Sequence, residues 1–219
     1  MFVQARLGSK RLPGKALLNL AGLPVLQHVL RALRPVEADV HALLTDRSSA
    51  SAFQPLAAAE GYQLFIGPVE DVLERFLRAA RLWRVDRLVR ATGDNPLVSA
   101  RAVQALIERH GAERCDLSHF LGLPLGTGVE IVESAALAKA ARLSRDPYER
   151  EHITTFLYRH PERFRIAEPL CPEPWSCPQA RVTLDTAEDY ERLQSLFEDL
   201  YRGEPIEIEQ LAAWLRGRR

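Results

Sequence analysis

The sequence predicts an α/β fold in which helices cover a mostly parallel sheet. Two observations predict it: short strand-like runs alternate with amphipathic helical stretches over the first 110 residues, and the composition is that of an ordinary globular domain. Of the 219 residues, 47% are hydrophobic and 26% are charged. This balance excludes disordered, collagen-like and disulfide-scaffold proteins. The length suits one domain, residues 1–219.

Four strands are expected in the first half of the chain, at residues 1–5, 38–44, 62–66 and 87–91. The second and fourth are rich in Val and Leu, which is typical of strands buried on both faces of a sheet. The first has only five residues before Arg6, which is short for a central strand. It is therefore either frayed or preceded by residues further upstream.

Four helices are expected between and after these strands, at residues 24–33, 48–60, 69–83 and 99–110. The first has a proline at its start and its apolar residues on one face. The last opens with Ser99, a residue type that caps helix N-termini.

After residue 112 the rhythm of the sequence changes. We expect helices at residues 134–143 and 148–159, and a proline-rich loop between the last two strands. The strands expected here are residues 129–132, 164–167 and 180–184. A closing helix starts at residues 186–189 with a Thr-x-x-Asp box, and a charged amphipathic tail follows it.

Charge and cysteine content exclude several functional classes. The 29 basic and 29 acidic side chains cancel, which argues against a protein that coats nucleic acid. No run of about 18 apolar residues exists and the amino terminus soon turns polar, so neither a membrane span nor a signal peptide is expected. We therefore expect a cytoplasmic protein. Its three cysteines lack the spacing of a zinc site.

The most informative stretch is residues 4–15, QARLGSKRLPGK, between the first strand and the first helix. Open α/β sheets bind ligands at this place. The stretch carries four cations and two glycines: Arg6, Lys10, Arg11, Lys15, Gly8 and Gly14. Such a loop suits a polyphosphate, although its spacing is not that of a Walker A loop or a dinucleotide fingerprint. The alternative is a basic turn that is merely solvated.

Two aspartates follow other predicted strands. Asp94 lies in residues 90–97, RATGDNPL, and Asp185 in residues 182–186, VTLDT. An aspartate at a strand-to-helix turn is often only a helix cap. If the loop binds a nucleoside triphosphate, however, the two carboxylates together are a suitable ligand pair for Mg²⁺.

Seven motifs, in order, resemble one enzyme family. They are residues 4–15, 22–24 (GLP), 70–73 (EDVL), 92–97 (TGDNPL), 126–130 (GTGVE), 150–154 (REHIT) and 184–189 (LDTAED). The chain resembles cytidylyltransferases of the spore-coat polysaccharide synthesis type, which are related to CMP-acylneuraminate and CMP-Kdo synthetases. The resemblance spans residues 4–189, and the first motif is its most specific part.

The resemblance implies the fold of nucleotide-diphospho-sugar transferases, a Rossmann-like three-layer sandwich. It implies CTP bound over the first strand, with Arg11 and Lys15 on the phosphates. The nucleotide-binding residues would be Ala5, Arg6, Gly8, Ser9, Arg11, Gly14, Lys15, Thr92 and Gly93. The catalytic residues would be Arg11, Lys15, Asp94 and Asp185, of which the two aspartates would hold Mg²⁺. The sugar acceptor would contact Glu130, Arg150, Glu151 and His152.

The implied activity is transfer of CMP from CTP to an acidic or amino sugar, with release of pyrophosphate, for surface polysaccharide synthesis. Related enzymes are dimers, and the excursion at about residues 115–180 is expected to bind the acceptor or the second subunit. Gly128 stands where many relatives have Asp, which leaves the acceptor pocket one carboxylate poorer. The alternatives are a glycosyltransferase, against which the absence of an Asp-x-Asp motif counts, a non-catalytic nucleotide-binding module, and a domain that binds incidental anions. For His152, an ordinary surface histidine is the alternative.

Overall fold

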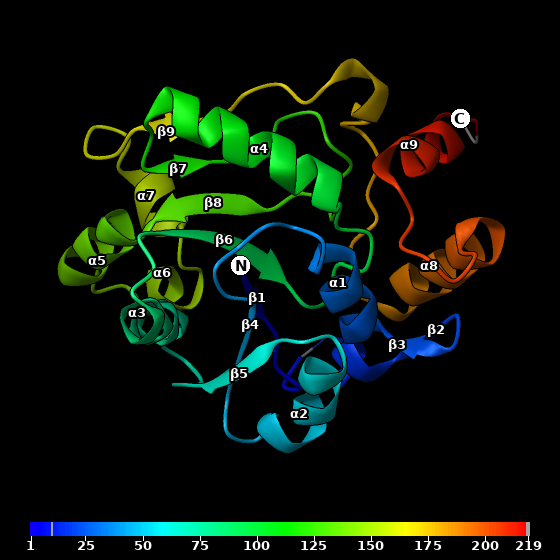
Figure 1. Cartoon of the computed structure of the whole chain (residues 1–219), viewed down its shortest axis with the longest axis horizontal. Coiled ribbons are helices and arrows are strands. Elements are labelled where there is room, and N and C mark those ends of the chain that lie inside the picture. The colour runs from blue at the N-terminus through cyan, green and yellow to red at the C-terminus, as the bar shows by residue number, and fades with distance from the viewer. Residues whose placement is uncertain (10, 218–219) are drawn as a thin grey trace.

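The structure is a computed structural model that describes residues 1–9 and 11–217, so Lys10 of the basic loop lies outside the described residues. In this part of the chain, a seven-stranded sheet has the order β5-β4-β1-β6-β8-β7-β9 (Figure 1). The strands are β1 (Phe2–Gln4), β4 (Ala42–Thr45), β5 (Gln63–Ile66), β6 (Arg87–Thr92), β7 (Leu117–Ser118), β8 (Glu130–Glu133) and β9 (Ile166–Ala167). All neighbours pair in parallel except at β8, which runs against β6 and β7. The predicted mostly parallel α/β fold is confirmed.

Strand β1 lies at the centre of the sheet although it has only three residues. Phe2 pairs with Ala42 of β4 on one side and with Arg90 of β6 on the other. The strand is therefore not frayed. Its side chains alternate between the two cores, Phe2 on one face of the sheet and Val3 on the other, as the two-residue period of a strand requires.

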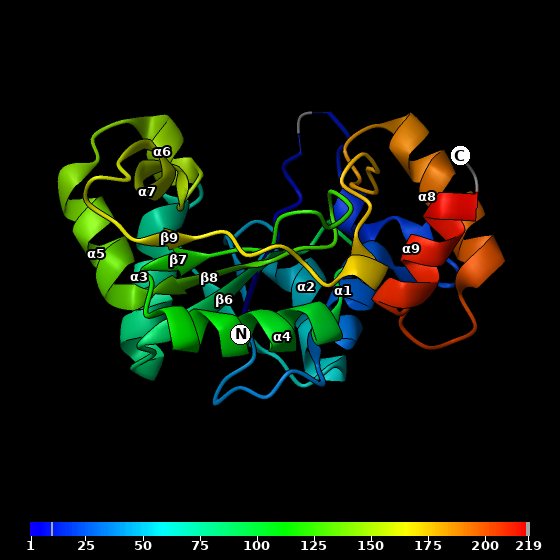
Figure 2. The same ribbon diagram turned by 90° about the horizontal axis from the view of Figure 1, so that it is seen from above.

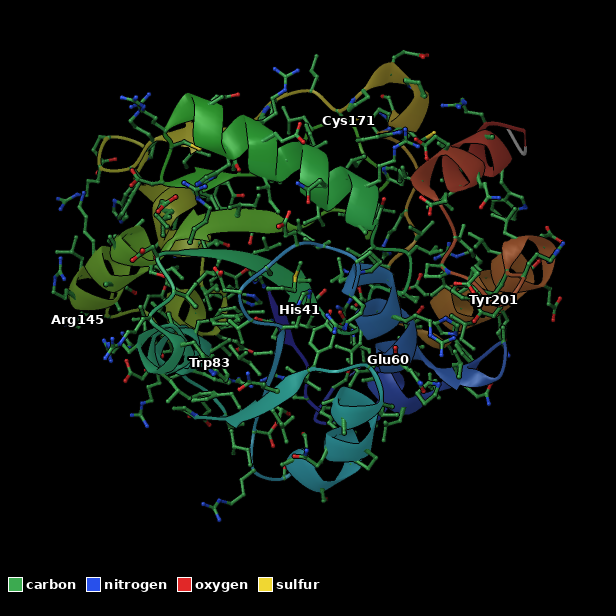
Figure 3. The ribbon with its side chains drawn as sticks, in the orientation of Figure 1. His41, Glu60, Trp83, Arg145, Cys171 and Tyr201 are labelled. Carbon is green, nitrogen blue, oxygen red and sulfur yellow. The ribbon has the colours of Figure 1, made fainter. Side chains whose placement is uncertain are left out.

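Helices cover both faces of the sheet and make three layers (Figure 2). One face packs against α1 (Val25–Leu33), α2 (Ala50–Ala59) and α4 (Ala100–Glu113). The opposite face packs against α3 (Val72–Trp83), α5 (Ser134–Leu143) and α7 (Thr155–Arg159), with α6 (Pro147–Glu151) beside α3. Trp83 of α3, labelled in Figure 3, lies with its ring centroid 5.6 Å from that of Phe2.

The chain ends in two helices that flank α1 at one end of the sheet (Figure 1). These are α8 (Ala187–Leu200) and α9 (Ile208–Gly217). The predicted Thr-x-x-Asp box starts α8: the Thr186 hydroxyl accepts from the Asp189 backbone, and the Asp189 carboxylate accepts from the Thr186 backbone. Each interaction satisfies an amide that a helix N-terminus would otherwise leave unpaired.

Three expectations about elements need correction, and one element was not expected. Residues 180–184 are not a strand, because Pro178 and the preceding loop leave them one isolated bridge between Arg181 and Leu125. Residues 148–159 are not one helix, because His152 has a non-helical backbone (φ −104°, ψ 81°) and separates α6 from α7. The strand expected from residue 38 begins only at Ala42. Residues 19–24 form an unexpected hairpin of β2 (Asn19–Leu20) and β3 (Leu23–Pro24).

Short 3₁₀ turns complete the fold at η1 (Lys15–Leu17) and η2 (Glu173–Trp175). Among the described residues, every helix is too short or too polar to cross a bilayer.

Candidate active site

A pocket of about 370 Å³ lies at the carboxyl ends of β1 and β6. It is lined by Gln4, Ala5, Arg6, Ser9, Arg11, Lys15, Ala16, Val72, Arg75, Thr92, Gly93, Asp94, Glu151, His152 and Asp185. Most of the predicted nucleotide-binding residues are in this set, and so are both predicted metal ligands. Four predicted residues do not line the pocket: Gly8, Gly14, Glu130 and Arg150.

Lys15 joins the two aspartates that the sequence places far apart. Its ammonium nitrogen lies 2.5 Å from Asp94 Oδ2 and 3.1 Å from Asp185 Oδ1, and it donates to the Leu184 carbonyl at 2.7 Å. The Lys15 side chain is only 13% exposed, so these contacts are shielded from solvent. Two carboxylates thus converge on one cation at the pocket wall.

Further cations surround Asp185. Arg11 approaches its Oδ1 at 2.9 Å and Arg181 approaches its Oδ2 at 3.0 Å. Burial alone raises the pKa of Asp185, but Lys15, Arg11 and Arg181 outweigh it and hold the pKa below its ordinary value. Asp185 is therefore ionised at neutral pH, as a ligand for a cation must be.

The basic loop is anchored to the turn between β4 and α2. The Leu7 amide donates to the Ser49 hydroxyl at 2.9 Å, and Ser49 in turn donates to Asp46. Gly14 has φ +69°, a conformation that favours glycine, and its amide closes the loop on the Leu7 carbonyl at 3.2 Å. Gly14 therefore shapes the loop from outside the pocket.

The end of β6 lies very close to the end of β1. The Gly93 amide donates to the Gln4 carbonyl at 2.7 Å. A Cβ atom at Gly93 would lie 2.8 Å from Ala5 Cβ and 2.7 Å from Leu26 Cδ1. Glycine is thus required at this position to bring Asp94 beside the basic loop.

The residues expected to contact the acceptor fall into two groups. Glu151 and His152 line the pocket, and Glu151 accepts from Arg6 Nη2 at 2.6 Å. Arg150 instead pairs with Asp71, the N-cap of α3, at 2.6 Å. It ties α6 to α3 and so holds the end of α6 at the pocket.

Glu130 is also held away from the pocket. It accepts from Arg90 at 2.6 Å, from Tyr158 at 2.9 Å and from Thr154. Burial raises the pKa of Glu130, but Arg90 and these hydrogen bonds outweigh it, and the net pKa is lowered. A role of Glu130 or Arg150 in acceptor binding stays a prediction.

Four residues that line the pocket were not predicted to have a role there: Gln4, Ala16, Val72 and Arg75. The signal for Arg75 was present, because it lies among the apolar positions of α3, three residues after Val72 and directly before Phe76. A charged residue on the apolar stripe of an amphipathic helix faces the core and needs a reason to be there.

The residues present fit a magnesium ion. Mg²⁺ is usually bound by one or two carboxylates together with phosphate oxygens, and Asp94 and Asp185 already share one cation. Within the described residues no cluster of three or more His, Cys, Asp or Glu side chains could form an all-protein metal site. A metal at this pocket would thus complete its shell with water or with oxygen atoms of the substrate.

A sheet with a basic loop and two convergent carboxylates at its strand ends defines an α/β protein of the nucleotidyltransferase class. The cytidylyltransferase family model matches residues 1–218, so the chain belongs to the cytidylyltransferase family. The resemblance seen in the motifs is confirmed.

Known relatives agree with this assignment. The chain is 32% identical over 205 residues to the spore coat polysaccharide biosynthesis protein SpsF of Bacillus subtilis, covering 90% of this chain and 85% of that protein. It is 36% identical over 110 residues to a 3-deoxy-manno-octulosonate cytidylyltransferase of Anaeromyxobacter dehalogenans, covering 49% of this chain and 45% of that enzyme. A solved cytidylyltransferase structure from Leptospira borgpetersenii is 27% identical, covers 99% of this chain and 93% of its own, and superposes with a TM-score of 0.91.

Proposed function

We propose that this protein transfers CMP from CTP to an acidic or amino sugar, releases pyrophosphate and requires Mg²⁺, as a cytoplasmic step in surface polysaccharide synthesis. The observation that carries the proposal is the convergence of Asp94 and Asp185 on Lys15 in a pocket walled by the basic loop. The names of the two relatives, one a spore-coat polysaccharide biosynthesis protein and one a 3-deoxy-manno-octulosonate cytidylyltransferase, support the choice of a sugar acceptor.

The basic loop would hold the triphosphate. Arg6, Arg11 and Lys15 line one pocket. The Arg11 side chain pairs with Asp185 but is 67% exposed, so it has room to turn towards a ligand. Charge-assisted hydrogen bonds from these side chains would neutralise the phosphates and stabilise the departing pyrophosphate. Catalysis would then consist mainly of positioning and of charge stabilisation.

Asp94 and Asp185 would hold the magnesium ion. When bound, Mg²⁺ supplies positive charge that polarises phosphate oxygens. Arg181 and Asp189 fix the position of Asp185, because Arg181 donates to its carboxylate and the Asp189 carboxylate accepts from its amide at 2.9 Å.

The acceptor would enter beside Glu151 and His152. An oxygen of the sugar attacks the α-phosphorus in line, a new phosphorus–oxygen bond forms, and the bond to the β-phosphate oxygen breaks. Glu151 and His152 would orient the sugar, since both line the pocket. Arg150 and Glu130 would position them by holding the chain on either side, through Asp71 and Thr154.

The segment at residues 115–180 would form a homodimer interface. Five large hydrophobic side chains are exposed there among the described residues, including Leu121 at 41%, Leu125 at 61% and Leu170 at 77%. Leu121 and Leu170 are bridge partners, so they are neighbours on the surface. Exposed apolar patches of this kind mark interaction surfaces. A monomeric mass in sedimentation equilibrium at micromolar concentration would contradict the dimer.

Nucleotide binding is the first experiment. Thermal shift with CTP, UTP, ATP and GTP in the presence of Mg²⁺ should show selective stabilisation by CTP, and Asp94→Ala should reduce it. A panel of acidic and amino sugars is then screened for pyrophosphate release. CTP binding without pyrophosphate release from any acceptor would favour a non-catalytic binding module. Absence of a selective shift would contradict the proposal and favour the glycosyltransferase or incidental-anion alternatives.

A further inference from the structure

Arg75 is the largest of the fully buried side chains, with 2% of its surface exposed, yet it lines the pocket. Its guanidinium donates from Nη2 to the Val69 carbonyl at 3.3 Å, and its Nε has no hydrogen-bond partner. A buried donor without a partner costs free energy. Such a group at a pocket wall indicates that a ligand supplies the missing acceptor.

A second unsatisfied buried atom lines the same pocket. Gln4 Oε1 accepts no hydrogen bond. Side chains two apart on a strand share a face, so Gln4 lies on the face of Phe2, whose ring packs 6.1 Å from that of Phe76. Phe76 directly follows Arg75 in α3. The unpaired acceptor of β1 and the unpaired donor of α3 are therefore on the same side of the sheet.

The structure makes room for the Arg75 side chain at a specific place. A Cβ atom at Gly67 would lie 2.6 Å from Arg75 Cγ and 3.0 Å from Arg75 Cβ. Glycine at position 67 thus lets the stem of Arg75 pass. Because the stem is packed and the head is not fully hydrogen-bonded, the guanidinium is held ready for a ligand rather than free to reach solvent.

A phosphate group does not fit the part of the pocket that Arg75 and Gln4 line. The cations that suit phosphates, Arg11 and Lys15, lie on the wall with Asp94 and Asp185. Gln4 Oε1, an unpaired acceptor, lines the same pocket, and a phosphate, which has no donor to offer, would leave it unpaired. Burial lowers the pKa of Arg75, and the nearby Asp46 carboxylate opposes this effect and partly offsets the charge of the guanidinium. A neutral group that offers both a donor and acceptors fits better.

We propose that Arg75 and Gln4 bind the Watson–Crick edge of the cytosine base and select CTP. The inference rests on the proposed function and adds the residues that determine its base preference. Cytosine presents an amino donor at N4 and acceptors at N3 and O2. Gln4 Oε1 accepts from the amino group, and the Arg75 guanidinium donates to N3 and O2.

Arg75 carries most of the discrimination against uracil. An arginine offers only donors, whereas a glutamine amide can turn and offer either its oxygen or its NH₂ group. Uracil has an N–H at position 3, which would meet the N–H groups of Arg75 and leave buried donors unpaired. Sites that leave buried polar groups unpaired reject the wrong substrate strongly.

The test measures binding of CTP, UTP and inorganic tripolyphosphate to the full chain by calorimetry, in the wild type and in Arg75→Met. Loss of a hydrogen bond from a charged group weakens binding by about 10- to 100-fold, and we expect this for CTP. The ratio of CTP to UTP affinity should fall towards one, and tripolyphosphate binding should not change. Arg78→Met is the matched control, because Arg78 lies on the exposed side of the same helix and pairs with Glu74. It should leave all three affinities unchanged.

A second comparison does not depend on the folding of Arg75→Met. Gln4→Leu should weaken binding of CTP but not of the triphosphate of pyrimidin-2-one riboside, which lacks the 4-amino group. Equal loss for both ligands would overturn the role of Gln4. Equal loss of CTP, UTP and tripolyphosphate in Arg75→Met would make Arg75 a phosphate ligand and overturn the inference. If the wild type binds no nucleotide, the proposed function itself fails. If the wild type binds CTP and Arg75→Met keeps the same preference for CTP over UTP, only the inference about Arg75 fails.

Discussion

At the scale of single residues, the candidate site is a balance of charge around Lys15. The ammonium group lies between Asp94 and Asp185, and Arg11 and Arg181 approach Asp185 from other directions. Two carboxylates side by side would repel each other without these cations. The arrangement therefore holds the two carboxylates close together, and it lowers the pKa of Asp185.

A substitution separates a catalytic role of Asp185 from a structural one. Asp185→Asn should lower turnover at least about 100-fold, the range seen when one group that stabilises developing charge is removed. Its free energy of unfolding should fall only modestly, because Asn keeps the shape of the side chain but loses the ion pairs with Lys15, Arg11 and Arg181. Pyrophosphate release and urea unfolding measure the two effects.

Thr186→Ala is the control at the next position. Thr186 caps α8, so its removal should cost about 0.5–2 kcal/mol of stability and leave most of the turnover intact. If Asp185→Asn behaved like Thr186→Ala, with near-normal turnover and lowered stability, Asp185 would be a helix-terminus residue and not a metal ligand.

The site residues that lie in contiguous motifs could be predicted from the sequence. Lys15, Asp94 and Asp185 each follow a strand-like run, and strand ends meet at one edge of a parallel sheet. Their contact through Lys15 was not predictable, because it depends on how the loop folds back over β1. Arg75 was overlooked because no motif contains it. Its position on the apolar stripe of α3 indicates burial, but its place in the pocket wall becomes visible only when α3 is packed on the sheet.

At the scale of elements, the site depends on how closely the end of β6 approaches β1. The two strands are parallel neighbours, and the Gly93 amide bonds to the Gln4 carbonyl where they end. Any side chain at position 93 would push the strand ends apart. The distance between Asp94 and the basic loop is set by this contact.

Gly93→Ala should therefore affect stability and binding together. The new methyl group would lie within 3 Å of Ala5 and Leu26, and overpacking of this kind typically costs about 1–3 kcal/mol. CTP affinity should fall as well, because Asp94 moves away from Lys15. Urea unfolding and calorimetry with CTP test both expectations.

A glycine in helix α4 provides the control for Gly93→Ala. Gly111→Ala, in a helix where the nearest atom to an added Cβ is an Arg87 nitrogen at 4.0 Å, should be neutral or stabilise the protein by up to about 1 kcal/mol. A Gly93→Ala variant as stable as Gly111→Ala, with unchanged CTP affinity, would show that the close approach of β6 to β1 is not required.

Elements were predictable where local pattern and tertiary packing agree. The helix α1 has its apolar residues on one face and packs that face on the sheet, so the expected range 24–33 and the observed Val25–Leu33 nearly coincide. Residues 180–184 have a strand-like composition, but strand pairing needs a partner, and Arg181 finds only a bridge to Leu125. The hairpin at residues 19–24 turns at Ala21 and Gly22, both with positive φ, in a stretch too short for a periodic signal.

At the scale of the whole molecule, the two cores enclose histidines that the candidate site does not use. His28, His41 and His110 are buried, and His41 lies against Tyr62 with ring centroids 5.2 Å apart (Figure 3). Burial lowers the pKa of all three histidines, and for His110 it outweighs the opposing hydrogen bond to Glu133. Folding therefore favours their neutral forms.

The stability of the whole protein should consequently fall as the pH drops from 7.5 to 5.5. The pKa of each of these histidines is lower in the folded chain than the value of about 6.5 expected in the unfolded chain. Below that pH the unfolded chain therefore binds more protons than the folded chain. The contribution of the three histidines to stability is fully present above pH 6.5 and is lost on acidification. Carboxylates with lowered pKa, such as Asp185 and Glu130, act only at lower pH, because their ordinary values are 3.8 and 4.5. Urea midpoints at several pH values, with an unchanged denaturant slope, measure the effect.

The variant His41→Phe keeps a ring against Tyr62 but cannot be protonated. Its stability should therefore depend less steeply on pH than that of the wild type. The control His160→Gln, at a more exposed position, should follow the wild type. A stability that stays constant or rises between pH 7.5 and 5.5 would mean that the buried histidines are protonated as readily in the folded protein as in the unfolded chain.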